Sequence, residues 1–298
     1  MAEQLIFLNG EFVKKEDAKV SVYDHGFLYG DGVFEGIRVY SGNVFRLKEH
    51  LVRLYESAKA ILLHIPYTLE EMTAIVVDTI RQNELLDGYI RLVVSRGPGN
   101  LGLDPASCPK PNVVVIAEQL ALFPKEMYEA GIPIITVATR RNRPDVLSPQ
   151  VKSLNYLNNI LVRIEAQLAG VSEALMLNDQ GYVTEGSGDN VFVVKGNKIV
   201  TPPASCGALE GITRNAIIEL AQKLGYDMRE ELVTRHDVYV ADEVFLTGTA
   251  AEVISVTNVD GRVIGTGVPG PITNVLLDEF RQLVVRDGEK VYEEEKIS

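Results

Sequence analysis

Two glycine-containing segments combine a flexible backbone with side chains that could take part in chemistry. YGDGVFEGIR, residues 29–38, offers aromatic side chains and a cation beside three glycines. EGITR, residues 210–214, precedes a predicted helix, and the first N–H groups of a helix attract an anion because they have no partner within it. Taken alone, each segment has a simpler explanation. The first is a turn leading into a strand, and the second is a helix cap formed by Thr213.

Three further segments carry an acid, an amine or a tight turn. TEGSGDN, residues 184–190, places Glu185 at the end of a predicted strand, and SPQVKSLNYLNN places Lys152 just before a predicted helix. TGTAAE, residues 247–252, is a turn of small residues whose N–H groups could bind an anion or a carboxylate. Most Glu and Lys side chains are solvated surface groups, so none of these segments decides the function by itself.

Length and composition predict an ordinary folded protein of about two domains, with 298 residues, 46% of them hydrophobic and 23% charged. The formal net charge of -12 opposes binding to nucleic acid or to an anionic membrane surface, so we expect neither partner. The chain has no apolar run of about 18 residues and no signal-like start. With only two cysteines, Cys108 and Cys206, it is predicted to be cytoplasmic with free thiols. The four scattered histidines form no zinc motif, so no metal is expected.

Periodicity in the first half of the chain predicts a sheet with two helices. Asn9 and Gly10 favour a tight hairpin turn, and Thr68 with Glu71 matches a capping box at a helix start. Pro66 should end the helix before it. The elements expected here are a hairpin at 5–13, helices at 48–65 and from 69, and strands at 89–95 and 112–117.

The second half mixes strands and helices without a regular βαβ alternation, which favours an α+β fold. Its expected strands are 132–139, 174–178, 191–194, 198–200, 243–246 and 252–258, and its expected helices are 156–169, 213–224 and 271–285. Between residues 118 and 131 the strand period is lost. We therefore expect a small N-terminal domain at 1–118, an interdomain loop at 119–131 and a larger C-terminal domain at 132–298.

Six motifs taken in chain order resemble the signature of fold type IV pyridoxal phosphate enzymes, specifically the branched-chain amino acid aminotransferase family. They are YGDGVFEGIR, HLVRL (residues 50–54), VKSLNYLNN, YVTEGSGDNVF, EGITR and FLTGTAAE, and they span residues 29–252. The resemblance implies a two-domain α+β fold like that of D-amino acid aminotransferase. A small N-terminal α/β domain would precede a larger C-terminal domain with mixed sheets, which binds pyridoxal 5'-phosphate.

The resemblance also implies a role for each cofactor-binding residue. Lys152 would be joined to the cofactor aldehyde and would later move the α-proton as a base. Glu185 would keep the ring nitrogen protonated through a charged hydrogen bond. Tyr156 would reach the phenolic oxygen. The residues implied for the phosphate are Arg53, Ile212, Thr213 and Thr249.

For the substrate, the resemblance implies transfer of an amino group between L-Leu, L-Ile or L-Val and 2-oxoglutarate, with ping-pong kinetics. Arg91 would meet the acidic end of glutamate, and Thr249 with Ala250 would hold the α-carboxylate. The partners are therefore small amino acids and 2-oxo acids. The remaining residues implied around the substrate are Tyr29, Phe34, Gly36, Arg38 and Tyr89.

The resemblance further implies a homodimer or a higher homo-oligomer, in which Tyr29 and the loop after Arg96 reach the neighbour's site. Other activities of the same fold stay open: a D-amino acid or R-selective amine aminotransferase, an aminodeoxychorismate lyase, or a cofactor-binding scaffold without turnover. GPGNLGLDP, residues 97–105, lacks the Arg-x-His pair that resembles the D-amino acid enzymes, which favours L-amino acids. Because Lys152 and Glu185 are both present, an enzyme is favoured over a scaffold.

Overall fold

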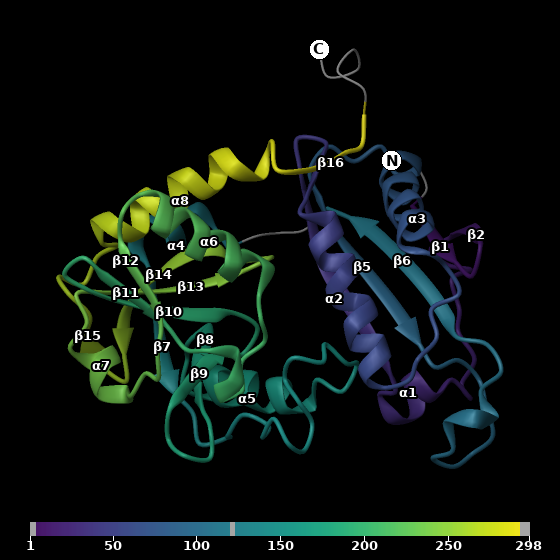
Figure 1. Ribbon diagram of the computed structural model, residues 1–298, viewed down its shortest axis with the longest axis horizontal. Coiled ribbons are helices and arrows are strands. Elements are labelled where there is room, and N and C mark those ends of the chain that lie inside the picture. The colour runs from purple at the N-terminus through teal and green to yellow at the C-terminus, as the bar shows by residue number, and fades with distance from the viewer. Residues whose placement is uncertain (1–3, 120–122, 293–298) are drawn as a thin grey trace. The chain divides into compact units, whose positions relative to one another are not determined.

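The computed structural model describes residues 4–119 and 123–292, which divide into two compact units (Figure 1). Unit 1 contains residues 4–119, 151–156 and 283–292, and unit 2 contains residues 123–150 and 157–282. The segments 151–156 and 283–292 therefore cluster with the N-terminal residues, although the expected boundaries place them in the domain 132–298. Part of the expected loop 119–131 is helix α4 (Lys125–Ala130), and its residues 120–122 lie outside the described residues.

Unit 1 is built on one antiparallel sheet in the order β16-β4-β3-β5-β6-β1-β2. The hairpin expected around Asn9 and Gly10 is confirmed: both residues have positive φ, 54° and 104°, as a tight hairpin turn requires. The strands are β1 (Leu5–Leu8), β2 (Glu11–Lys14), β3 (Gly32–Tyr40), β4 (Asn43–Phe45), β5 (Gly88–Ser95), β6 (Asn112–Glu118) and β16 (Gly288–Lys290).

Two long helices, α2 (Leu47–Ala60) and α3 (Leu69–Gln82), pack on this sheet (Figure 1). The expected capping box is confirmed, because Thr68 and Glu71 each bond to the backbone N–H of the other. Helix α2 ends five residues before the expected Ile65. Leu62 has a left-handed φ of 52°, and the Arg96 guanidinium caps the end of the helix by donating to the carbonyls of Ile61 and Leu62.

The apolar sides of α2, α3 and the sheet form the core of unit 1. Its members include Leu51 and Leu54 from α2, Val76 from α3, and Ile37 and Ile90 from the sheet, all fully buried. Short helices α1 (His25–Tyr29) and η1 (Pro105–Ser107) lie in the two loops before β3 and β6. This packing makes β3 and α2 the rigid elements on which side chains of unit 1 are mounted.

Unit 2 contains a mixed sheet in the order β12-β11-β10-β13-β14-β7-β8-β9, with β15 paired to β14. The pairs β11–β12, β14–β7 and β7–β8 are parallel, and the other neighbours are antiparallel. Its strands are β7 (Ile132–Thr136), β8 (Glu173–Leu177), β9 (Val183–Gly186), β10 (Asn190–Lys195), β11 (Lys198–Thr201), β12 (Asp227–Glu230), β13 (Glu243–Gly248), β14 (Glu252–Val259) and β15 (Arg262–Val263).

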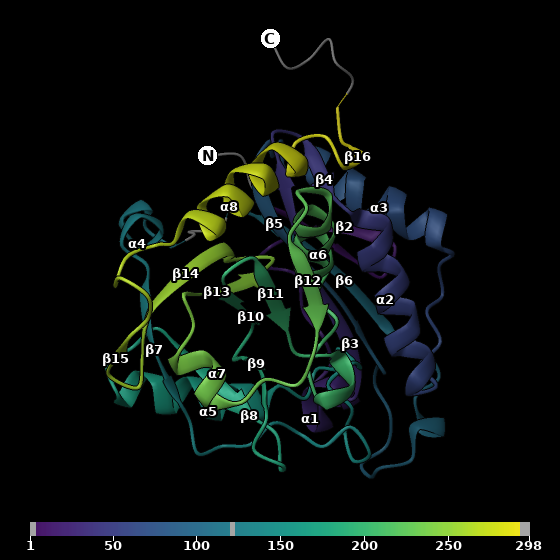
Figure 2. The ribbon, with the colours of Figure 1, turned by 60° about the vertical axis from the view of Figure 1, so that its left-hand side comes forward.

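Helices of unit 2 cover this sheet: α5 (Leu157–Leu168) packs on β8, and α6 (Ile212–Lys223) packs on β12 and β13 (Figure 2). The others are α7 (Arg235–Tyr239), α8 (Pro271–Val284) and η2 (Ala204–Cys206). The expected α+β class with two domains is confirmed. Over the described residues, every helix is too short or too polar to cross a bilayer.

Candidate active site

The backbone around Lys152 is attached to two elements of unit 1. Its carbonyl accepts a hydrogen bond from the Phe34 N–H of β3 at 3.0 Å, and its own N–H donates to Ser57 Oγ of α2 at 3.1 Å. Two residues later, the Leu154 N–H donates to the Gly32 carbonyl at 2.9 Å. These hydrogen bonds hold residues 151–156 against β3 and α2, so the backbone that carries the Lys152 side chain is fixed in position.

The Lys152 amine lies between a phenol and an aromatic ring. Nζ donates to the Tyr156 hydroxyl at 3.0 Å and lies 4.6 Å from the centroid of the Phe34 ring. The Phe34 and Tyr156 rings meet edge to face, 4.9 Å apart. A half-buried primary amine with an oriented phenol beside it is suited to attack a carbonyl carbon and to exchange protons.

Next to Lys152, β3 and β5 form an aromatic wall that contains the guanidinium of Arg91. The Arg91 guanidinium lies 4.7 Å from the Phe34 ring centroid and 5.4 Å from that of Tyr89. Gly36 leaves room for Tyr89, because a Cβ at this position would lie 1.9 Å from the Tyr89 hydroxyl and would force that side chain to move. Burial raises the pKa of Tyr89, so its hydroxyl stays neutral. Arg38 pairs with Tyr89 in register, and its guanidinium lies over the Tyr40 ring.

Tyr29, at the end of α1, contacts a different set of residues. Its ring packs edge-on against His25, and its hydroxyl accepts a hydrogen bond from the Gly102 N–H at 3.0 Å. Tyr29 is therefore bonded to the loop that follows Arg96. The family resemblance implies that both Tyr29 and this loop reach the site of a neighbouring subunit. Its side chain is partly exposed, at 37%.

Arg53, the residue expected at the phosphate, is held by a buried carboxylate. Glu35 accepts from Arg53 Nε and Nη2, both at 2.8 Å, and Glu35 Oε2 lies 2.8 Å from His50 Nδ1. Burial opposes ionisation of Glu35, but the charges and hydrogen bonds of Arg53 and His50 outweigh it and lower its pKa to about 2. Burial lowers the pKa of His50, against the raising effect of Glu35.

The low pKa of Glu35 predicts a specific loss of stability in acid. The carboxylate titrates at about 2 when folded and near its ordinary 4.5 when unfolded, so it stabilises the fold above pH 4.5 and loses this effect as the pH falls toward 2. The full effect is about 3 kcal/mol. Urea unfolding of the apoprotein at about pH 6 and about pH 3 should show roughly 2 kcal/mol more acid loss for wild type than for Glu35→Gln. Equal acid losses in the two proteins would contradict this assignment.

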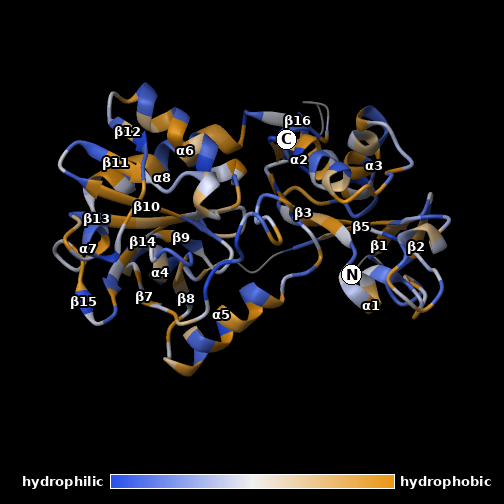
Figure 3. Ribbon diagram, turned by 60° about the horizontal axis from the view of Figure 1, so that its bottom comes forward, coloured by the Kyte–Doolittle hydropathy of each residue, from blue (hydrophilic) through white to orange (hydrophobic). Residues whose placement is uncertain are grey.

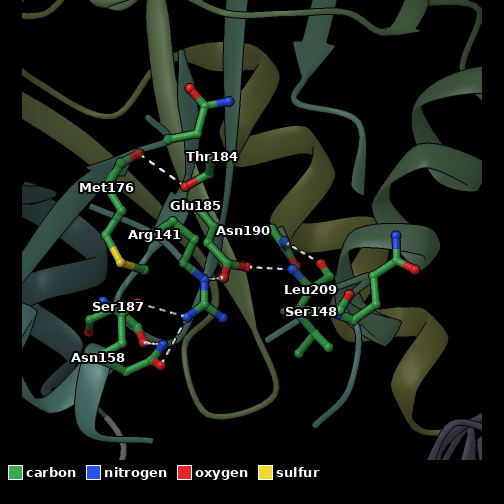
Figure 4. A network of polar contacts seen from close by, with 12 residues as sticks. Arg141, Ser148, Asn158, Met176, Thr184, Glu185, Ser187, Asn190 and Leu209 are labelled. Atoms are coloured by element: carbon green, nitrogen blue, oxygen red, sulfur yellow. Dashed lines mark hydrogen bonds and ion pairs between the residues drawn. The ribbon is translucent and has the colours of Figure 1, made fainter. Parts of the chain in front are cut away.

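In unit 2, Glu185 lies in a buried polar network (Figure 4). Its Oε1 is 2.7 Å from Arg141 Nε, and its Oε2 accepts from the Leu209 N–H at 2.8 Å. Arg141 also donates through Nη1 to the side-chain oxygens of Asn158 and Asn159, at 3.1 and 3.2 Å. The carboxylate is therefore fixed in position, and a neighbouring cation favours its charged form.

Removing Arg141 should strongly destabilise the protein, because Glu185 would remain as a buried charge without its cation. For Arg141→Met we expect a loss of about 3–5 kcal/mol in the free energy of unfolding, measured with urea. The double variant Arg141→Met/Glu185→Gln removes both charges and should recover a large part of that loss. If the two substitutions instead add, the ion pair does not hold the carboxylate.

Asn190 connects the segments that precede the remaining expected cofactor residues of unit 2. Its side chain donates to the Leu209 carbonyl at 2.8 Å, and its backbone pairs with Thr247 in the β10–β13 register. Helix α6 begins after Gly211, which provides no side-chain cap, so the alternative of a cap by Thr213 is wrong. Ile212 and Thr213 form its buried first turn, whereas Thr249 and Ala250 lie in the turn after β13, half-buried and exposed.

Besides Tyr29 in unit 1, the expected residues divide into two groups according to their unit. The first group consists of Phe34, Gly36, Arg38, Arg53, Tyr89, Arg91, Lys152 and Tyr156, and the second of Glu185, Ile212, Thr213, Thr249 and Ala250. The sequence did not predict Glu35, Ser57 and Arg141, which bond to Arg53, Lys152 and Glu185, respectively. It also did not predict His50, which bonds to Glu35. Glu35 stands inside a quoted motif, but its partners are 15 and 18 residues away on α2, a contact that no local pattern signals.

A family model described as amino-transferase class IV matches residues 32–259 of the chain. The matched region is well over half of the chain and contains Lys152, Tyr156 and Glu185. The chain therefore belongs to the class IV aminotransferases.

Individual relatives of the chain carry a more specific name than the family. A Methanocaldococcus jannaschii protein, provisionally named a branched-chain-amino-acid aminotransferase, is 54% identical over 97% of this chain and 99% of its own. The crystal structure of the Escherichia coli branched-chain amino acid aminotransferase has a TM-score of 0.93 at 38% identity and covers 96% of both chains. The branched-chain amino acid aminotransferase of T.th., solved in complex with N-(5'-phosphopyridoxyl)-L-glutamate, has a TM-score of 0.90 at 39% identity and covers 96% of this chain and 95% of its own.

Proposed function

We propose that the protein is a branched-chain amino acid aminotransferase that uses pyridoxal 5'-phosphate to transfer the amino group of L-Leu, L-Ile or L-Val to 2-oxoglutarate. The observation that carries the proposal is the Lys152 amine, bonded to the Tyr156 hydroxyl beside an aromatic wall that contains the Arg91 cation. The amine can bond to the cofactor and move protons, and the aromatic wall contacts the side chain of the substrate and so determines which amino acids bind.

The donor set fits the cofactor group by group. Lys152 offers an amine for its aldehyde, and Tyr156 offers a phenol for its phenolic oxygen. Glu185 is a buried carboxylate whose charged form Arg141 favours, which suits a protonated ring nitrogen. For the phosphate, α6 starts without a side-chain cap, and a helix N-terminus binds such an anion. We assign the phosphate to Arg53, Ile212, Thr213 and Thr249.

When bound, the cofactor supplies an electron sink for the bond broken at the amino acid Cα. Lys152 then acts as the base that removes the α-proton and later returns a proton, a contribution of about 10²–10⁴-fold in rate. Tyr156 holds Nζ by its hydroxyl, which limits the positions from which the amine can reach the proton. Glu185 keeps a proton on the ring nitrogen.

The aromatic wall explains how one pocket accepts two kinds of side chain. Phe34 and Tyr89 offer apolar surface to the alkyl groups of Leu, Ile and Val. Arg91 lies against both rings, and its guanidinium offers a cation to the side-chain carboxylate of glutamate. The L-glutamate moiety in the complex of the T.th. relative supports this second role. Backbone N–H groups of Thr249 and Ala250 are assigned to the α-carboxylate.

A panel of L- and D-amino acids with 2-oxoglutarate as acceptor tests the proposal, with glutamate and the new 2-oxo acid as products. We expect L-Leu, L-Ile and L-Val to react and D-Ala to remain unchanged. Strong activity with D-Ala and none with L-Leu would assign the chain to the D-amino acid enzymes. Release of pyruvate from aminodeoxychorismate without an acceptor would indicate a lyase, and cofactor binding without any turnover would indicate a scaffold.

We also propose a homodimer or a higher homo-oligomer. The ribbon of α5 has orange, hydrophobic segments in Figure 3. One face of this helix carries apolar side chains that are at least 45% exposed in the single chain: Leu157, Ile160, Leu161, Ile164 and Leu168. An exposed row of this kind typically marks a protein interface. The contact of Tyr29 with Gly102 fits the idea that both cover the neighbour's site. Sedimentation should give at least twice the mass of the chain, whereas a monomer would contradict this part of the proposal.

The free thiols Cys108 and Cys206 support a reducing compartment, and we propose the cytoplasm.

A further inference from the structure

Glu35 has no part in the function proposed above, although it lies between two residues of the aromatic wall. Successive side chains of a strand point to opposite faces, so Phe34 and Gly36 of β3 share one face and Glu35 belongs to the other. That other face is covered by α2. The Glu35 side chain is completely buried there, which is costly for a carboxylate unless polar partners compensate it.

The two partners of Glu35 lie on one side of α2, and the carboxylate fixes the guanidinium of one of them, Arg53. His50 and Arg53 are three residues apart on α2 and therefore lie on the same side of the helix. Arg53 donates through Nε and Nη2 to the two oxygens of Glu35, both at 2.8 Å, which sets the plane of the guanidinium. His50 Nδ1 lies 2.8 Å from Oε2, and because a carboxylate only accepts, this nitrogen is the donor.

We propose that Glu35 is a positioning residue that aims Arg53 at the cofactor phosphate. This inference rests on the proposed function, in which Arg53 binds that phosphate. An arginine side chain has many rotamers, and a bidentate carboxylate selects one of them before the cofactor arrives. Strand β3 would thus serve the substrate with one face and the cofactor with the other.

Glu35 has two opposing effects on the affinity for phosphate, so the direction in which the affinity changes tests the proposal. Its negative charge offsets the positive charge of Arg53 and by itself weakens phosphate binding. Its geometry fixes the guanidinium and by itself strengthens phosphate binding. Removing the charge therefore tightens binding if charge dominates and weakens it if position dominates. We expect position to dominate, since removing an outer partner of a ligating residue commonly costs about 10–100-fold in affinity.

The experiment compares pyridoxal phosphate with pyridoxal, which lacks the phosphate. Apoprotein of the full chain is titrated with each compound, and binding is followed by absorbance. For Glu35→Gln we expect the Kd of pyridoxal phosphate to rise by about 10-fold or more and the Kd of pyridoxal to stay within about twofold. Glu35→Asp keeps the charge but shortens the side chain, so it should show the same selective loss and serves if Glu35→Gln does not fold.

Two controls connect the effect to Arg53. Glu49→Gln removes an exposed carboxylate from the same helix and should leave both Kd values unchanged. In an Arg53→Ala background, Glu35→Gln should cause no further selective loss, because the residue that it positions is gone. Tighter binding of pyridoxal phosphate to Glu35→Gln, or equal losses for both compounds, would overturn the inference. Failure of the wild type to bind pyridoxal phosphate would instead overturn the proposed function, and this inference with it.

Discussion

Lys152→Ala is expected to lower kcat by about 10⁴-fold, the upper end of what a positioned acid–base group contributes. In the proposed function the amine both joins the cofactor aldehyde and moves the α-proton, and alanine can do neither. The hydrogen bond from Nζ to the Tyr156 hydroxyl is also lost. Steady-state transfer from L-Leu to 2-oxoglutarate measures this effect, and pyridoxal phosphate should still bind through its phosphate and ring nitrogen.

Lys125→Ala is the matched control for this substitution. Lys125 lies on α4 with a side chain that is 85% exposed, in a surface ion pair with Glu129, so its removal should leave kcat unchanged. Added methylamine should restore part of the activity of Lys152→Ala, because a free amine can replace the missing base. Turnover of Lys152→Ala within about tenfold of wild type would rule out this lysine as the base.

Glu185→Gln should lower kcat on the order of 10²–10³-fold, as the loss of a fixed electrostatic contact commonly does. A carboxylate holds a proton on the ring nitrogen by a charged hydrogen bond, whereas a neutral amide supports it poorly. Glutamine has nearly the same shape, so the contact with the Leu209 N–H can persist, but Arg141 loses its charged partner. We therefore expect a lower stability, and kcat is compared at a temperature below the unfolding transition of the variant. Single-turnover kinetics with L-Leu should place the loss in the proton-transfer step.

Glu126→Gln on α4 provides the corresponding control, since Glu126 is exposed and the same change of charge should leave catalysis intact. The spectrum of the bound cofactor gives a second readout, because the protonation state of the ring nitrogen alters its absorbance. If Glu185→Gln keeps both the spectrum and kcat of wild type, another group must protonate the ring.

Local sequence signals predicted the elements of the fold well. The capping box of Thr68 and Glu71 and the hairpin turn at Asn9 and Gly10 depend on neighbouring residues, so a pattern of four residues specifies them. Strand β12 was missed, because its sequence Asp227–Glu230 is exposed and charged and becomes a strand only by pairing with β11. Its stabilisation is tertiary and leaves no apolar period to detect.

The residues of the candidate site also divide into those that a local motif predicts and those that are defined only by contacts in the folded chain. Lys152 and Glu185 could be proposed from the sequence because each stands in a motif with a characteristic sequence. Glu35 and Arg141 were not found, because what defines them is a contact made in the folded chain: Glu35 with Arg53, and Arg141 with a carboxylate 44 residues further along, Glu185. Membership of residues 151–156 in unit 1 likewise follows from backbone hydrogen bonds to Phe34 and Gly32.

Reduction with borohydride tests the central claim most directly. Purified protein saturated with pyridoxal phosphate should absorb in the near-visible range, and borohydride should fix the cofactor to the chain. After proteolysis, mass spectrometry should find the added mass in the peptide containing Lys152. Modification of a different lysine, or a protein that stays colourless and unmodified with excess cofactor, would contradict the account.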